Sequence, residues 1–265
     1  MLVTPRVSRT VGFGFAAGAA LTLAGFTPAP ASASVIIADN FNGKSGSNTL
    51  QGTTVSQSIS ATLEQWGSNA FDPVTVNGQV TVRGVSGQRF AFVDIPTFAP
   101  SAVEPIVSLS ADINVEGAQW IQVALAATPT SGDPNVFNDN QIGLRVTETD
   151  WELLASASDT LIASGTGDFD AGTFAFEVRY DSTDNTVDVL IDGSAAAADQ
   201  SLNAFTPDLG GSAIIHFTPG SNGFIARSPR VDNFLIETVV PEPGSFWLLA
   251  LGVTAVLSRK QKAGG

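Results

Sequence analysis

The sequence predicts an all-β protein built as a single antiparallel β sandwich or jelly roll. Short stretches of alternating apolar residues recur along the chain, Gly, Pro, Asn and Asp separate them, and helical periodicity is almost absent between residues 34 and 239. No fixed-period repeat occurs, which disfavours a propeller or solenoid. We expect one domain over residues 34–239, with targeting segments at 1–33 and 240–265.

The first 33 residues have the form of a secretory signal peptide. Arg6 and Arg9 precede an apolar run, and small residues follow, with Ala31 and Ala33 at the positions typical of signal peptidase cleavage. We expect export by the Sec machinery and cleavage before Ser34. The arginines are not adjacent, so no twin-arginine signal is present. A buried N-terminal helix is the alternative.

Eleven strands are expected in the domain, because apolar side chains at alternate positions share one face of a strand. They cover residues 34–41, 78–84, 89–96, 106–115, 119–127, 140–148, 150–158, 173–182, 186–193, 212–218 and 230–238. The turn formers Ser-Thr-Asp-Asn at 182–185 predict a hairpin between two of them. Brief helical turns are expected at 60–66 and 195–202.

The ends of the domain carry similar tetrapeptides. The first expected strand contains Asp39 in Ala-Asp-Asn-Phe, and the last contains Asp232 in Val-Asp-Asn-Phe. Together with the 173–193 hairpin, this order resembles the concanavalin A-like jelly rolls of legume lectins, laminin G-like modules and many carbohydrate-binding modules. The resemblance implies that the terminal strands pair in one sheet, which would bring Asp39 near Asp232.

One short segment is a candidate for catalysis. Residues 148–152, Glu-Thr-Asp-Trp-Glu, resemble the strand motif of laminarinase-like retaining glycoside hydrolases. Carried over, the resemblance makes Glu148 the nucleophile, Asp150 its electrostatic helper and Glu152 the acid/base. The flanking alternation instead predicts a turn between two strands at 147–150, which would separate the carboxylates.

Aromatic residues offer a candidate binding surface. In residues 119–127, alternation directs Ile121, Val123 and Leu125 to the core and places Trp120 with Gln122 on the opposite face. Such a face can stack on a sugar ring. Trp151 and Trp66 are further candidates, although large aromatics mostly pack in cores.

Oxygen donors in loops offer a candidate site for structural Ca²⁺. Hard oxygen ligands at irregular spacing suit this ion, and two sets are available: Asp133, Asn135, Asn138 and Asp139 in one loop, or the pair Asp39 and Asp232. Ordinary turn formation explains the same residues.

Charge and composition exclude several functions. Between Asp39 and Glu242 the chain has 25 carboxylates and seven cations, a net charge of −18, which repels nucleic acid and anionic lipid. Cysteine is absent, so a thiolate metal site and a Cys nucleophile are excluded. The single histidine, His216, lies in an apolar strand and is expected to be a sheet residue rather than a catalyst.

The C-terminal segment combines Pro241, Glu242 and Pro243, an apolar run from Phe246 to Leu257, and the cations Arg259, Lys260 and Lys262. Twelve residues form about 18 Å of helix, against roughly 30 Å of hydrocarbon, so the run is a marginal permanent anchor. The segment closely resembles the PEP-CTERM sorting tail of Gram-negative bacteria. This resemblance implies recognition by a membrane-embedded exosortase, cleavage near Pro-Glu-Pro, and release or surface attachment. A simple C-terminal anchor is the alternative.

We therefore expect an exported surface or matrix protein whose domain binds glycan or matrix without catalysis. A laminarinase-like hydrolase using Glu148, Asp150 and Glu152 is one alternative. A purely structural surface protein is the other.

Overall fold

The computed structural model describes part of the chain, and all described residues fall in the unit Ala31–Gly265. The described ranges are 33–44, 50–60, 63–68, 74–76, 78–82, 87–96, 98–102, 104–129, 137–138, 141–155, 160–203, 205–207, 209–219 and 229–239. The expected signal peptide, apart from its last residue Ala33, and the whole expected tail 240–265 lie outside these ranges.

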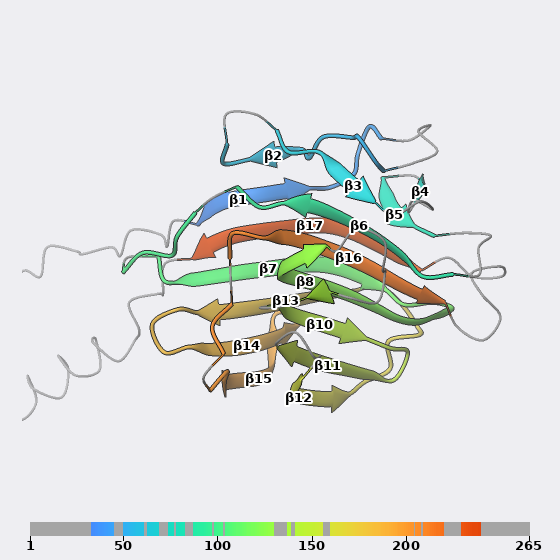
Figure 1. Cartoon of the computed structure of the whole chain (residues 1–265). Coiled ribbons are helices and arrows are strands. Elements are labelled where there is room, and N and C mark those ends of the chain that lie inside the picture. The colour runs from blue at the N-terminus through green and yellow to red at the C-terminus, as the bar shows by residue number, and fades with distance from the viewer. Residues whose placement is uncertain are drawn as a thin grey trace, which may run out of the picture. The chain divides into compact units, whose positions relative to one another are not determined.

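Every regular element of the described chain is a β-strand, so the predicted all-β class is confirmed (Figure 1). All strand pairs recorded in both sheets are antiparallel. In the part of the chain that the structure covers, no helix is both long and apolar enough to cross a membrane.

The first sheet has nine strands, seven of them in a continuous order. That order is β15 (Ser194–Ser201), β14 (Thr186–Ile191), β13 (Phe174–Asp181), β7 (Ile106–Asn114), β17 (Arg230–Val239), β1 (Ser34–Asp39) and β2 (Gln57–Ser58). In addition, β5 (Gln79–Thr81) pairs with β17 and with β4 (Val74–Val76). The terminal strands β1 and β17 are direct neighbours, as the resemblance to concanavalin A-like jelly rolls implies.

The second sheet has eight strands, again with seven in continuous order. That order is β12 (Thr160–Thr166), β11 (Asp150–Ala155), β10 (Ile142–Val146), β8 (Ala118–Pro129), β16 (Ser212–Pro219), β6 (Arg89–Asp94) and β3 (Trp66–Ser68). The short β9 (Phe137–Asn138) pairs with the end of β8. Each central strand of this sheet therefore has one face toward the core and one away from it.

The hydrophobic core lies between the inner faces of the two sheets. Alternate residues of β7, such as Leu109 and Ile113, and of β8, such as Ile121 and Val123, belong to one cluster with at most 1% of their surface exposed. Burial of apolar surface on this scale is the main stabilising contribution to such a sandwich. The alternation in the sequence thus correctly predicted which residues of β8 face the core.

The predicted hairpin at 182–185 is confirmed. Asp181 pairs with Thr186 across the turn, and Asn185 takes a positive φ of 55°, which Asn tolerates better than most residues. The Asn185 side chain also accepts a hydrogen bond from the Tyr180 hydroxyl at 3.2 Å and donates to two backbone carbonyls of residues 203 and 205. A single side chain therefore fixes both the turn and the neighbouring loop.

The helical turn expected at 195–202 is wrong. Residues 194–201 form the edge strand β15, joined to β14 by a turn at Asp192 and Gly193 whose φ values are 49° and 73°. Two consecutive positive φ angles define the hairpin turn that Asp-Gly favours. Pairing with β14 thus overrides the high helix propensity of the alanine run. Where 60–66 is described, it is likewise extended or bridged rather than helical.

Candidate functional site

The face of the second sheet that points away from the core carries a row of polar and aromatic side chains. In cross-strand register, these residues are Phe90, His216, Gln122, Arg145, Glu152 and Ser164, from β6, β16, β8, β10, β11 and β12. We call this the polar row. Six strands at the usual spacing give it a length of about 24 Å.

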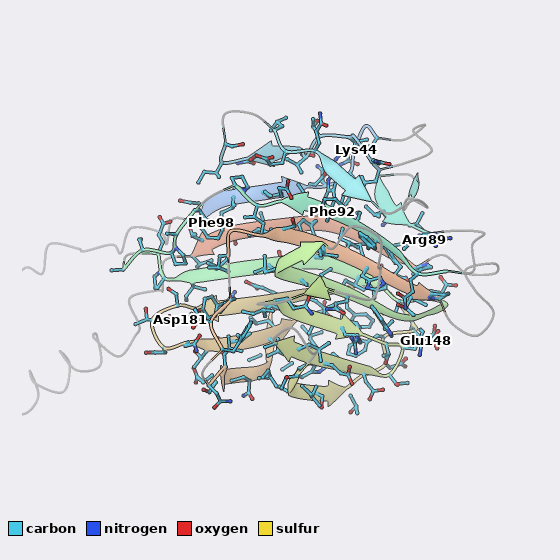
Figure 2. The ribbon with its side chains drawn as sticks, viewed as in Figure 1. Lys44, Arg89, Phe92, Phe98, Glu148 and Asp181 are labelled. Carbon is cyan, nitrogen blue, oxygen red and sulfur yellow. The ribbon has the colours of Figure 1, made fainter. Side chains whose placement is uncertain are left out.

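A second row, almost wholly apolar, runs beside the first. Its residues in register are Phe92, Ile214, Ala124, Gly143, Leu154 and Leu161. We call this the apolar row. Ile214 and Phe90 form a small hydrophobic cluster of their own, against which Phe92 packs, and the Phe92 ring covers Gly67 of β3. Figure 2 labels Phe92 on the β6 strand.

Trp120 stands beside the polar row and contacts two of its members. Its ring meets the His216 ring edge to face, with centroids 4.6 Å apart, and the guanidinium carbon of Arg145 lies 4.6 Å from its centroid. Arg145 Nη1 also lies 3.4 Å from Glu152 Oε2. Cation–π attraction and the ion pair together fix the position of the Arg145 side chain between Trp120 and Glu152.

Two buried polar atoms on this face have no hydrogen-bond partner among the described residues. They are the amide nitrogen of Gln122, whose residue is 2% exposed, and the hydroxyl of Thr218, whose residue is 6% exposed. An unsatisfied buried donor costs about 1–3 kcal/mol, so such groups are usually met by water or ligand. A Cβ on Gly143 would lie 2.6 Å from the Gln122 nitrogen, so the absence of a side chain there makes room for the amide.

Burial determines the protonation state of His216. Desolvation first, and the nearby charge of Arg145 second, lower the pKa of His216 to about 3. The imidazole is therefore neutral at physiological pH. The expectation that His216 is a sheet residue agrees with its position in β16.

Exposure varies along the face. The β16 and β6 side is buried, while the β10 to β12 side stays accessible: the side chain of Arg145 is 20% exposed, that of Glu152 is 37% exposed, and Leu161 is 53% exposed. An apolar strip beside a polar one matches a ligand with an apolar face and hydrogen-bonding edges. A sugar ring has both.

Two carboxylates of the catalytic hypothesis, Asp150 and Glu152, lie in β11, but Glu148 lies outside that strand. Glu148 lies in the connection between β10 and β11, at the end of the sheet (Figure 2), and accepts a hydrogen bond from the Gly117 backbone at 3.4 Å. Asp150 opens β11 and is bonded to the hydroxyls of Thr147 and Thr149. Glu152 pairs with Arg145. The turn expected from the alternation is present, and each carboxylate has a different partner.

Two of the three tryptophans considered for binding lie in the sandwich core. Trp151 is 4% exposed and Trp66 1%, and both belong to the main hydrophobic cluster. Alternation along β11 separates Trp151 from its neighbour Glu152. Trp120, with Gln122 on the same face, is therefore the tryptophan placed on the outer face of the second sheet.

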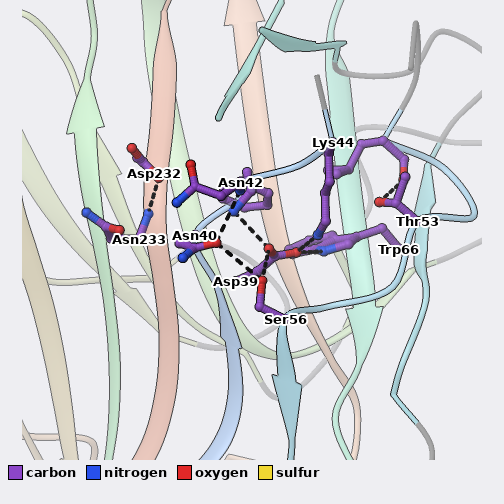
Figure 3. Close-up of polar contacts among 11 residues, drawn as sticks. Asp39, Asn40, Asn42, Lys44, Thr53, Ser56, Trp66, Asp232 and Asn233 are labelled. Atoms are coloured by element: carbon purple, nitrogen blue, oxygen red, sulfur yellow. Dashed lines mark hydrogen bonds and ion pairs between the residues drawn. The ribbon is translucent and has the colours of Figure 1, made fainter. Parts of the chain in front are cut away.

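Asp39 is the centre of a buried polar cluster (Figure 3). Its carboxylate is 1% exposed and accepts hydrogen bonds from the Phe41 backbone at 2.9 Å, the Ser56 hydroxyl at 3.0 Å and the Trp66 indole at 2.7 Å, with the Lys44 ammonium in direct contact. Burial lowers the pKa of Lys44, and Asp39 opposes that shift. A lysine thus supplies the positive charge beside this carboxylate.

The second aspartate of the proposed pair has other contacts. Asp232 Oδ1 accepts a hydrogen bond from the Asn233 backbone (Figure 3). The Asn233 side chain donates to Asp112. Across β1 and β17, Asp39 is in register with Phe234 rather than Asp232. Within the described ranges no group of three or more acidic or histidine side chains could hold a metal ion.

The other calcium candidates fall largely outside the described chain. Asp133, Asn135 and Asp139 are not among the described residues, and Asn138 is described only as part of β9.

Sequence reasoning did not single out Arg145. Its position in the alternating segment 142–146, opposite Leu144 and Val146, assigns it to the outer face and was the signal available.

Residues 239–261 match the PEP-CTERM protein-sorting motif. This chain carries an envelope-sorting signal. The PEP-CTERM motif indicates an exported protein that is sorted to the cell envelope of a Gram-negative bacterium, and its match begins at Val239, the last residue of β17. No curated protein matches the chain.

Solved structures resemble the described sandwich. An endo-1,3-beta-glucanase from Streptomyces sioyaensis aligns with a TM-score of 0.52 and 12% identity over 81% of this chain and 99% of that one. A protein of unknown function with a galectin-like fold from Bacillus subtilis aligns with a TM-score of 0.47 and 12% identity over 67% of this chain and 90% of that one. At these identities the first likeness shows a shared jelly-roll fold and nothing about activity.

Proposed function

We propose that this chain is an exported envelope protein whose β sandwich binds a glycan without cleaving it. The leader 1–33 directs it through the Sec machinery, the sandwich 34–239 is the functional domain, and the tail 240–265 holds it in the inner membrane until an exosortase cuts near Pro241-Glu242-Pro243. The sorting motif at 239–261 supports the route. The mature domain then acts at the cell surface or in the extracellular matrix.

The binding surface is the outer face of the second sheet, where the polar and apolar rows run side by side. The observation that carries this assignment is the buried Gln122 amide, which lacks a hydrogen-bond partner within the described chain beside Trp120. A hydroxyl-bearing ligand would satisfy that donor and pack its ring against the apolar row. The surplus of carboxylates favours a neutral polysaccharide over an acidic one.

A glycan array probed with the mature chain, with and without Ca²⁺, tests this function. We expect binding to neutral polysaccharide and loss of that binding in Trp120→Ala. The control Ile59→Ala should keep the binding, because the exposed Ile59 side chain follows β2 of the first sheet and does not belong to the second sheet. Ca²⁺ dependence would support the loop site at Asp133, Asn135, Asn138 and Asp139.

The same samples distinguish the alternatives. Release of reducing ends from a β-glucan, abolished by Glu152→Gln, would replace the binding function with glycoside hydrolysis. Neither binding nor turnover on any glycan would leave a structural surface protein.

A further inference from the structure

A single carboxylate joins the first and last strands of the sandwich. Glu104 Oε2 accepts a hydrogen bond from the Thr238 hydroxyl at 2.5 Å, and Glu104 Oε1 accepts one from the Ser34 hydroxyl at 3.3 Å. Ser34 and Thr238 are direct partners in the β1–β17 ladder. Glu104 therefore contacts the first residue of β1 and the second-to-last residue of β17.

This carboxylate is held in place by its own segment. The Ser101 hydroxyl accepts a hydrogen bond from the Glu104 backbone at 2.9 Å, and the Ser101 backbone donates one to the Glu104 carbonyl at 3.1 Å. The next carbonyl, of Pro105, accepts hydrogen bonds from the backbone and hydroxyl of Ser182. Since Thr238 is also 6% exposed, the site is ordered before any further group reaches it.

Leader removal would create such a group. Hydrolysis of the Ala33–Ser34 peptide bond consumes one water, leaves a carboxylate on Ala33 and frees the nitrogen of Ser34 as an ammonium group. In any staggered rotamer the nitrogen of a serine lies within about 4 Å of its own hydroxyl oxygen. The Ser34 hydroxyl lies 3.3 Å from Glu104, so the new positive charge arises within about 7 Å of this carboxylate, and rotation of the freed terminus can bring the two into contact.

We propose that Glu104 is the receiving site for the α-ammonium group of mature Ser34, and that this ion pair fastens β17 at the base of the sorting tail. The match to the sorting motif begins at Val239, directly after Thr238, so the contact lies one residue from the motif. Removal of the leader would thereby strengthen the strand from which the tail emerges. The inference rests on the proposed export and is independent of glycan binding.

The test is the pKa of the Ser34 amine in the exported, leader-free chain with its tail, held in detergent micelles. N-terminal sequencing first identifies the terminus, and ¹³C-methylation of the amine then allows its titration by NMR. An ordinary α-amino pKa is about 7.7–8.0, and a nearby carboxylate should raise it by about one unit. Glu104→Gln keeps the hydrogen-bonding shape but removes the charge, so it should return the pKa to the ordinary range.

The control is Glu116→Gln, in the turn between β7 and β8, which should leave the amine pKa raised. A merely structural role for Glu104 would not move this pKa in either variant. An ordinary pKa in the wild-type chain that begins at Ser34 would overturn the ion pair alone. A chain that begins at Met1 would overturn the proposed export as well.

Discussion

The guanidinium carbon of Arg145 lies 4.6 Å from the centroid of the Trp120 ring while Arg145 Nη1 lies 3.4 Å from Glu152. Three strands of the second sheet, β8, β10 and β11, each supply one member of this group. The arginine covers part of the tryptophan on which the proposed glycan binding depends. Its removal therefore has separable effects on stability and on access to Trp120.

Arg145→Ala should lower the free energy of unfolding by about 0.5–1 kcal/mol, because it removes a partly exposed cation–π contact and ion pair. Trp120 should also become more accessible, whereas Trp66 and Trp151 stay buried. Acrylamide quenching of tryptophan fluorescence checks the second effect. Arg179→Ala, which breaks the Glu177 pair on the first sheet, is the matched control and should leave quenching unchanged.

Gln122→Met should make the ligand-free protein more stable and weaken glycan binding. Methionine has a similar shape but no donor to leave unsatisfied, so the variant should gain up to about 1 kcal/mol in the free state. Urea unfolding checks the gain in stability, and glycan affinity measured on the same samples checks the weaker binding. Lower stability together with unchanged affinity would show that the amide has an internal partner.

Acidification should destabilise the protein through His216. The folded pKa is about 3, below the unfolded value near 6.5, so between these limits the unfolded state binds the proton first. The free energy of unfolding should fall by roughly 1.4 kcal/mol per pH unit across that window, and this contribution is constant above pH 6.5. Unfolding measured at several pH values in wild type and His216→Phe isolates it. Parallel pH profiles in the two proteins would contradict the assignment.

Lys44→Met should cost about 3 kcal/mol of stability, because it leaves the buried Asp39 carboxylate without its counter-ion. Adding Asp39→Asn should recover part of the loss, since an amide oxygen can still accept the Trp66 indole hydrogen bond. Chemical denaturation of the single and double variants checks this. Glu152→Gln, which breaks an exposed pair, should change stability by less than about 1 kcal/mol. Equal losses of stability in Lys44→Met and Glu152→Gln would contradict the distinction between the buried and the exposed ion pair.

Alternation in the sequence was sufficient for the central strands. Ile121, Val123 and Leu125 predicted the inner face of β8, and the same period placed Trp120 and Gln122 outside. It was insufficient at the edges. Among the described strands, β12 and β15 lie at the ends of their sheets, where one side pairs with no described strand. Little burial is required there, so their side chains show no clear period. The Asp192-Gly193 turn was the signal for β15.

Contacts between distant residues were the other limit. Asp39 was a candidate metal ligand because the resemblance to concanavalin A-like jelly rolls implied that it lies near Asp232, yet its partners include Ser56 and Trp66 from other segments. The contact of Arg145 with Trp120 likewise depends on the register of β8 and β10, which residue spacing alone does not define. The sequence predicted the faces of the strands, but the contacts made on each face required the three-dimensional structure.

The position of β17 bears on when the protein can fold. It lies between β1 and β7 in the first sheet, and among the described strands β1 otherwise pairs only with the two-residue β2. Until the last ten residues of the domain have arrived, the opening strand has almost no backbone partner and the sheet has a gap at its centre. The first sheet can therefore be completed only after almost the whole domain has been synthesised. Completion of the fold would follow only once the segment just ahead of the sorting motif is available to pair with β1 and β7.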